Sequence, residues 1–189
     1  MIIEKFKFVI KKQNRGSVKM YFGIFDEETV TNLSLHGNKP ILIRIFNQNS
    51  SIEEHTVIQN EEDYINILEL YLKDYVEDPN QNELNDTFEK LNDFILNNDF
   101  DEIIVHCTMG ISRSPAIMIC IAKMLKNKFF EDVVKEYFKA YNRHIVKSFE
   151  EYPYKVKELE IKSLLRESPI RKPVSSLEYN EEGHILLRR

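Results

Sequence analysis

Residues 103–115 read IIVHCTMGISRSP, and this stretch decides how the rest of the chain is interpreted. Its apolar start favours a buried strand, and a run of helix-forming residues follows Pro115. Proline suits the first turn of a helix, where its missing N–H loses no hydrogen bond. We therefore predict a strand, a tight loop that carries Cys107 and Arg113, and a helix that begins near Ser114.

A loop of this kind is suited to binding a phosphate dianion. Its backbone amides can converge on one point, with the positive end of the next helix behind them. Gly110 lets the backbone curl where a side chain would clash. Arg113 can hold two phosphate oxygens at once, which a lysine could not reproduce. The predicted phosphate-binding residues are Thr108, Met109, Gly110, Ile111, Ser112 and Arg113.

The same positive environment favours the thiolate of Cys107, which is the nucleophilic form of cysteine. A thiolate held beneath a bound phosphorus would attack it and form a phosphocysteine intermediate. Ser114 could donate a hydrogen bond to the sulfur and ease its departure in the second step. His106 directly precedes the cysteine, and we expect it to shape the loop by hydrogen bonding.

The string His-Cys-x5-Arg-Ser at residues 106–114 resembles the signature loop of the cysteine-dependent protein tyrosine phosphatases. The longer string VHCTMGISRSP looks most like the dual-specificity branch, and the similarity extends over roughly residues 65–127. Residues 142–144, Asn-Arg-His, resemble a stretch found at this place in small bacterial members. The resemblance implies a phosphatase that needs no metal or cofactor and acts on a phosphorylated protein or a small phosphate ester. Phosphotyrosine, phosphoserine and phosphothreonine are all candidate substrates.

The resemblance also implies a general acid, an aspartate that protonates the leaving oxygen and later activates water. It should lie on a separate loop that follows the preceding strand. Asp74 lies 33 residues before Cys107 and directly follows a predicted strand, whereas Asp78 lies 29 residues before it. Strand register favours Asp74, and the spacing from Asp78 to Phe88 looks like the dual-specificity pattern. We favour Asp74, keep Asp78 as the alternative, and rank Glu77 third.

Hydrophobic patterning predicts the elements around the loop. Period-two patterns and apolar runs predict strands over residues 6–10, 18–25, 41–46, 65–72 and 103–105. Helical patterns predict helices near residues 27–33, 84–96, 114–126, 131–141 and 149–166. Strands alternate with helices and helices then close the chain, which indicates an α/β fold with a central, mostly parallel sheet flanked by helices. Residues 1–166 form the predicted phosphatase domain, and residues 167–189 form a C-terminal tail.

Composition limits the other classes of function. The 189 residues suit one domain, and a net charge of −5 without a basic patch argues against nucleic-acid binding. The longest apolar run is far shorter than the roughly 20 residues that cross a bilayer. Cys107 and Cys120 are the two cysteines, so a disulfide framework is not expected, and Cys120 in its apolar helix suits the core. We expect a cytoplasmic protein that makes no membrane contact; its oligomeric state stays open.

Two other functions compete with hydrolysis. The loop could bind phosphate without turnover, as in a catalytically weak pseudophosphatase. A sulfur-transfer or arsenate-reducing enzyme could also use a thiolate loop, although the pair Arg113-Ser114 and the long upstream region argue against it. The loop has no lysine between Cys107 and Arg113, which makes a phosphoinositide substrate less favoured.

Overall fold

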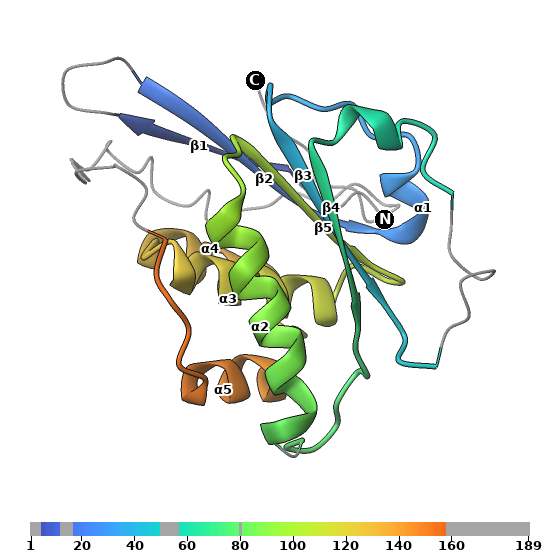
Figure 1. Ribbon diagram of the computed structural model, residues 1–189, viewed down its shortest axis with the longest axis vertical. Helices are drawn as coiled ribbons and strands as arrows, with labels where there is room; N and C mark the ends of the chain where they lie inside the picture. The colour runs from blue at the N-terminus through green and yellow to red at the C-terminus, as the bar shows by residue number, and fades with distance from the viewer. Residues whose placement is uncertain (1–4, 12–16, 50–56, 80, 158–189) are drawn as a thin grey trace, which may run out of the picture.

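A five-stranded sheet forms the centre of the molecule (Figure 1). The computed structural model describes residues 5–11, 17–49, 57–79 and 81–157. In spatial order the strands are β1 (Lys5–Lys11), β2 (Ser17–Asp26), β5 (Glu102–Cys107), β3 (Pro40–Phe46) and β4 (Asn66–Tyr71). The last four in this order run parallel, and β1 pairs antiparallel with β2 at one edge. The predicted α/β fold with a mostly parallel sheet is confirmed.

Helices cover the sheet on both sides. They are α1 (Glu27–Val30), α2 (Gln81–Asn97), α3 (Arg113–Met124), α4 (Lys128–Tyr137) and α5 (Arg143–Glu151). Helices α2 to α5 gather on one side of the sheet, and the short α1 lies on the other (Figure 1). A 3₁₀ turn, Glu61–Asp63, precedes β4. None of the helices in the described part of the chain combines the length and the apolar character needed to span a bilayer.

Strand β5 delivers Cys107 to the carboxyl-terminal edge of the sheet. All residues of β5 are buried, with β2 on one side and β3 on the other. At the end of the strand, Cys107 lies opposite Asp26 of β2 and Ile45 of β3. Open α/β sheets bind their ligands outside the carboxyl ends of the strands. This edge is therefore where the fold favours a binding site.

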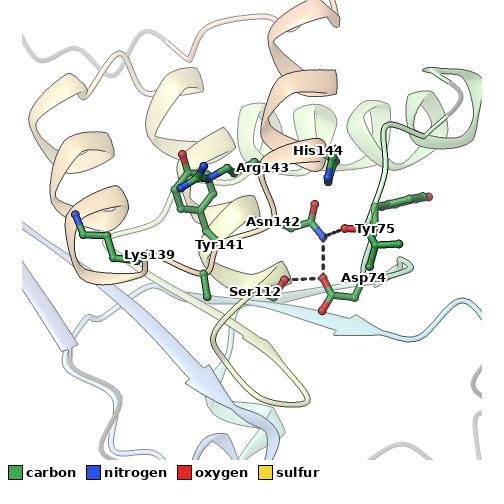
Figure 2. A pocket seen from close by; sticks show the side chains of 10 residues that line it. Asp74, Tyr75, Ser112, Lys139, Tyr141, Asn142, Arg143 and His144 are labelled. Atoms are coloured by element: carbon green, nitrogen blue, oxygen red, sulfur yellow. Dashed lines mark hydrogen bonds between the residues drawn. The ribbon is translucent and has the colours of Figure 1, made fainter.

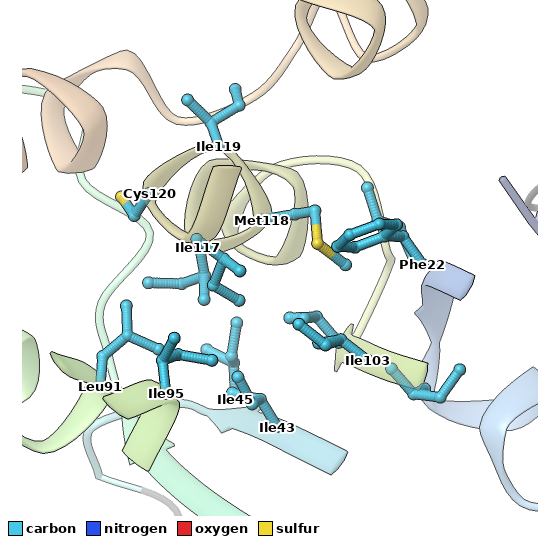
Figure 3. Close-up of a cluster of buried hydrophobic side chains, with 14 of the residues drawn as sticks. Phe22, Ile43, Ile45, Leu91, Ile95, Ile103, Ile117, Met118, Ile119 and Cys120 are labelled. Carbon is cyan, nitrogen blue, oxygen red and sulfur yellow. The ribbon is translucent and has the colours of Figure 1, made fainter. Parts of the chain in front are cut away.

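Helix α3 packs its apolar side chains onto the sheet. Figure 3 shows Ile117 directed toward Ile43 and Met118 directed toward Phe22, and all four side chains are buried. The helix also contacts α4 and α5 on its outer side, so it is the central buried helix that the sequence predicts. Cys120 is fully buried in this helix, and burial raises the pKa of its thiol. Close packing on both sides fixes the start of α3 relative to the end of β5.

The position predicted for the last helix is wrong. Patterning placed it over residues 149–166, but α5 begins after Asn142, which is its N-cap, and ends before Tyr152. Pro153 explains why the helix ends here, because the proline ring clashes with the residue before it and disfavours helical backbone angles at that residue. Tyr152 is accordingly extended, with a ψ of 136°. Residues 158–166, and the predicted tail over residues 167–189, lie outside the described part of the chain.

Helix α4 begins earlier and ends earlier than the pattern over residues 131–141 predicts. Asn127 caps it, since its side-chain oxygen accepts from the N–H of Phe130 at 3.0 Å. The helix ends at Tyr137, because the next residue, Phe138, has a φ of −108° and a ψ of 69°, outside the helical region. The turn that follows leads to Asn142 and brings the start of α5 to the edge of the sheet that carries Cys107.

Candidate active site

The signature loop, residues 107–113, curls around the sulfur of Cys107. The N–H of Gly110 donates to Sγ at 3.3 Å, and Ser114 Oγ lies 3.2 Å from the same sulfur. Gly110 has a φ of 68°, a left-handed conformation that residues with a Cβ rarely adopt. The glycine therefore allows the turn that aims its own amide at the sulfur. Cys107 itself is buried at the base of the loop.

The loop residues Met109 and Ile111 turn their side chains to solvent. Met109 is 59% exposed and Ile111 is 37% exposed. The hydrogen bonds found among the described residues leave the backbone N–H groups of both residues, and that of Ser112, without a protein acceptor. Any contact between Met109 or Ile111 and a bound phosphate would therefore run through these free amides.

Arg113 is held as a buried cation with donors to spare. Its Nη1 donates to Asn47 Oδ1 at 2.8 Å and to the carbonyl of Leu72 at 3.1 Å, and its Nη2 donates to Thr108 Oγ1 at 3.2 Å. A guanidinium carries five N–H donors. Among the described residues, the Nε–H and one Nη2–H of Arg113 have no partner, and no carboxylate pairs with it. Two donors on one guanidinium can bind two oxygens of one phosphate as a fork.

Asn47 and the Leu72 carbonyl are functional groups that the sequence interpretation did not identify. Asn47 directly follows β3, and Leu72 directly follows β4. Both strands run parallel to β5, so their carboxyl ends meet at the edge that holds Cys107. A usable signal was present, because Asn47 is the first polar residue after a fully buried strand.

Asp74 lies against the signature loop. Its Oδ1 accepts from Ser112 Oγ at 2.5 Å and from Asn142 Nδ2 at 2.7 Å (Figure 2). Asp74 follows β4 by a few residues, as the predicted acid loop requires, and it lines a pocket of about 390 Å³ next to the loop. Tyr75, Ser112, Tyr141 and Asn142 line the same pocket. Cys107 is not part of its lining, so the pocket adjoins the sulfur site without containing it.

Asp78 lies apart from the signature loop and faces helix α5. Its carboxylate pairs with His144 Nδ1 at 2.6 Å and with the ammonium of Lys147. Hydrogen bonds from Lys147 and His144 hold the pKa of Asp78 below its ordinary value. The hydrogen-bond partners thus distinguish the two candidate acids, since only Asp74 bonds to a residue of the signature loop.

His106 does not make the hydrogen bonds that the sequence interpretation expected. The residue is 1% exposed, and neither ring nitrogen has a partner among the described residues. Burial, together with the positive charge of Arg44 on the neighbouring strand, lowers the pKa of His106 to about 3. The ring packs edge-on against Phe46, with the two centroids 6.2 Å apart. His106 therefore supports the loop as a neutral side chain that packs against its neighbours.

Three kinds of reactive group meet at this edge of the sheet. They are the thiol of Cys107, the guanidinium of Arg113 with its two free donors, and the carboxyl group of Asp74. No group of three or more His, Cys, Asp or Glu side chains in the described ranges is arranged to hold a metal ion. The set of side chains and loop amides is suited to binding a phosphoryl group, attacking it and moving a proton.

A parallel α/β sheet whose central strand ends in such a Cys-x5-Arg loop, followed by a buried helix, defines the class of cysteine-dependent phosphatases. A family model of the dual specificity phosphatase catalytic domain matches residues 31–155. The match covers more than half of the chain, and the chain belongs to this family of protein phosphatases. Comparison with curated proteins found no match.

Proposed function

We propose that the protein hydrolyses phosphate monoesters through a phosphocysteine intermediate, with phosphotyrosine and phosphoserine or phosphothreonine as substrates. One observation carries the proposal: Cys107 lies at the base of a loop whose Arg113 keeps two N–H donors free for a phosphate. The family supports phosphatase chemistry in general, and the residue roles below follow from the contacts of each group.

In the first step, the thiolate of Cys107 attacks phosphorus in line with the leaving oxygen. A sulfur–phosphorus bond forms while the ester P–O bond breaks. The fork of Arg113 and the free loop amides hold the phosphoryl oxygens, where negative charge must be stabilised in the transition state. Asp74 in its protonated form gives its proton to the leaving oxygen, so the product departs as an alcohol or a phenol.

In the second step, water attacks the phosphocysteine and Asp74, now ionised, takes a proton from that water. The sulfur–phosphorus bond breaks, inorganic phosphate leaves, and the thiolate is restored. Ser114 Oγ, 3.2 Å from the sulfur, can donate a hydrogen bond to the departing thiolate. The N–H of Gly110 supports the same charge from the other side of the loop. Both donors make sulfur a better leaving group.

The choice of Asp74 over Asp78 rests on their hydrogen-bond partners. Asp74 is bonded to Ser112 of the loop, whereas Asp78 is bonded to His144 and to the ammonium of Lys147, and these hydrogen bonds favour the ionised form of Asp78. A general acid must carry a proton at the start of the reaction, and ion pairing opposes that state. Asp74 therefore meets the requirement of position, and among the described residues it is not ion-paired as Asp78 is with Lys147.

The contact between Asp74 and the loop also disfavours a module that binds phosphate without turnover. Such a module would need the thiolate and the fork but not an acid beside them. A nucleophilic Cys107 must stay reduced, which is consistent with the reducing cytoplasm as the working compartment.

The direct test is hydrolysis of p-nitrophenyl phosphate by the wild type and by Cys107→Ser. The hydroxyl is a far weaker nucleophile than a thiolate, so kcat should fall by about a thousandfold or more. Mass spectrometry of rapidly quenched wild-type protein should detect one added phosphoryl group on Cys107. Equal, negligible turnover by both proteins would refute the proposal, and faster turnover of arsenate or thiosulfate would favour the sulfur chemistry instead.

A further inference from the structure

Asn142 connects three parts of the site, although it lies outside the signature loop and outside the acid loop. It is 5% exposed and precedes α5. Its Nδ2 donates to Asp74 Oδ1 at 2.7 Å and to the carbonyl of Tyr75 at 2.9 Å, while its backbone N–H donates to the carbonyl of Ser112 at 3.1 Å. Figure 2 shows Asn142 directed toward Asp74 and Tyr75.

The orientation of the Asn142 amide follows from its partners. The two groups near Nδ2 are oxygens that can only accept from it, a carboxylate and a carbonyl. The group near Oδ1 is the N–H of Ile145, which can only donate, at 3.2 Å. A flipped amide would lose all three hydrogen bonds, so one orientation is fixed. The side chain of Asn142 therefore presents a donor, and never an acceptor, to Asp74.

Two donors converge on a single oxygen of Asp74. Ser112 Oγ and Asn142 Nδ2 both bond to Oδ1, and no described residue bonds to Oδ2. In a carboxylic acid one oxygen carries the proton and the other accepts hydrogen bonds as a carbonyl oxygen. Two donors on Oδ1 make it the accepting oxygen, so the proton of the neutral acid belongs on Oδ2.

We propose that Asn142 is a positioning residue that, together with Ser112, holds Asp74 so that Oδ2 carries and delivers the proton. This inference rests on the proposed function and extends it to a residue 68 positions away from the acid. Asn142 touches neither the sulfur nor the guanidinium in any hydrogen bond of the described residues. The proposal therefore predicts that a change of its side-chain amide acts mainly on the proton transfers that Asp74 performs.

Asn142→Asp tests this role with little change in shape. Aspartate caps a helix as well as asparagine does, so the bond from Ile145 to the side-chain oxygen is kept. The second side-chain atom changes from a donor to an acceptor, and an ionised carboxylate there repels the negative charge that Asp74 develops as it gives up its proton. Asn127→Asp is the matched control, because Asn127 caps α4 with the same kind of bond, from Phe130, and no hydrogen bond of the described residues joins it to Asp74.

The readout is the dependence of kcat/KM on the leaving group. Phenyl phosphate releases a poor leaving group that needs a proton, whereas p-nitrophenyl phosphate releases a good one that needs it much less. We expect Asn142→Asp to lower kcat/KM for phenyl phosphate by about 10- to 100-fold, the range for loss of a hydrogen bond to a charged group. The loss for p-nitrophenyl phosphate should stay within about threefold, and Asn127→Asp should match the wild type on both substrates.

A double-mutant cycle with Asp74→Asn shows whether Asn142 acts through the acid. If it does, Asn142→Asp costs nothing further on phenyl phosphate once Asp74 is Asn. Additive losses, or an equal loss on both substrates, would overturn the positioning role and assign Asn142 to the general shape of the loop. The proposed function would survive that result as long as the wild type hydrolyses the substrate and Cys107→Ser does not. Equal turnover by the wild type and Cys107→Ser would overturn the proposed function and this inference with it.

Discussion

Replacing Arg113 with lysine keeps the positive charge and removes the fork. The guanidinium uses three N–H groups on Asn47, Leu72 and Thr108 and leaves two for the phosphate. An ammonium has three donors on a single nitrogen, so it cannot bond to the three protein acceptors and to the phosphate oxygens at the same time. We expect the variant to lose at least one charge-assisted hydrogen bond to the phosphoryl group, a loss of about 2–3 kcal/mol. That loss corresponds to a fall of about 30- to 150-fold in kcat/KM.

Steady-state hydrolysis of p-nitrophenyl phosphate measures this prediction, with kcat and KM determined separately. Both should worsen, because the fork contacts the phosphoryl group in the substrate complex and in the transition state. Calorimetric titration with inorganic phosphate measures binding alone and should show weaker affinity. The unpaired groups around the lysine should also lower the thermal midpoint by about 2–8 °C, equivalent to about 1–2 kcal/mol. Wild-type kcat/KM in a folded Arg113→Lys protein would contradict the proposal that Arg113 binds two phosphate oxygens.

Three further predictions test the acid, the core and a buried charge. Asp74→Asn should lower kcat for phenyl phosphate by about 10²- to 10⁴-fold, whereas Asp78→Asn should stay within about twofold; the reverse order would show that the wrong aspartate was chosen. Ile117→Ala leaves a cavity beneath α3, and urea unfolding should show a loss of about 2–5 kcal/mol with an unchanged m-value. Burial opposes the charge of Glu131, but lysines of α3 and α4 hold its pKa at about 2. Because this folded-state pKa is lower than the unfolded value of 4.5, the charge stabilises the fold at neutral pH and that stability disappears as the pH falls from about 4.5 to 2. Glu131→Gln should therefore be less stable than the wild type by about 2 kcal/mol at pH 7, and the gap should close in acid; a gap that is independent of pH would refute the pairing.

The strand, loop and helix around Cys107 were predicted correctly because they depend on residues close together in sequence. The strand, the glycine turn and the helix that follow one another around Cys107 are each set by local patterning and backbone geometry. The signature loop could therefore be interpreted within about ten residues of sequence. The central burial of α3 was predicted for the same reason, because its residues are apolar on nearly every side.

Features that depend on distant residues could not be predicted in this way. Asp74 and Asp78 differ by only four positions, and the partners that distinguish them are Ser112 for Asp74, and His144 and Lys147 of α5 for Asp78. The last helix was misplaced because an amphipathic pattern continues past Pro153, where the backbone leaves the helix. His106 was expected to form hydrogen bonds because it is polar, yet its strand position buries it among apolar neighbours and Arg44.

The topology shows which of these distant residues a sequence could still reveal. In a parallel sheet the carboxyl ends of neighbouring strands meet at one edge, so polar residues just after those strands are brought together. This rule selects Asn47 after β3 and Asp74 after β4, and it adds them to Cys107 at the end of β5. It cannot select Asn142, which reaches the site from a helix cap and depends on how α4 and α5 pack on α3. The groups proposed to bind and transform the phosphate thus follow from strand order, whereas the group proposed to orient the acid follows from helix packing.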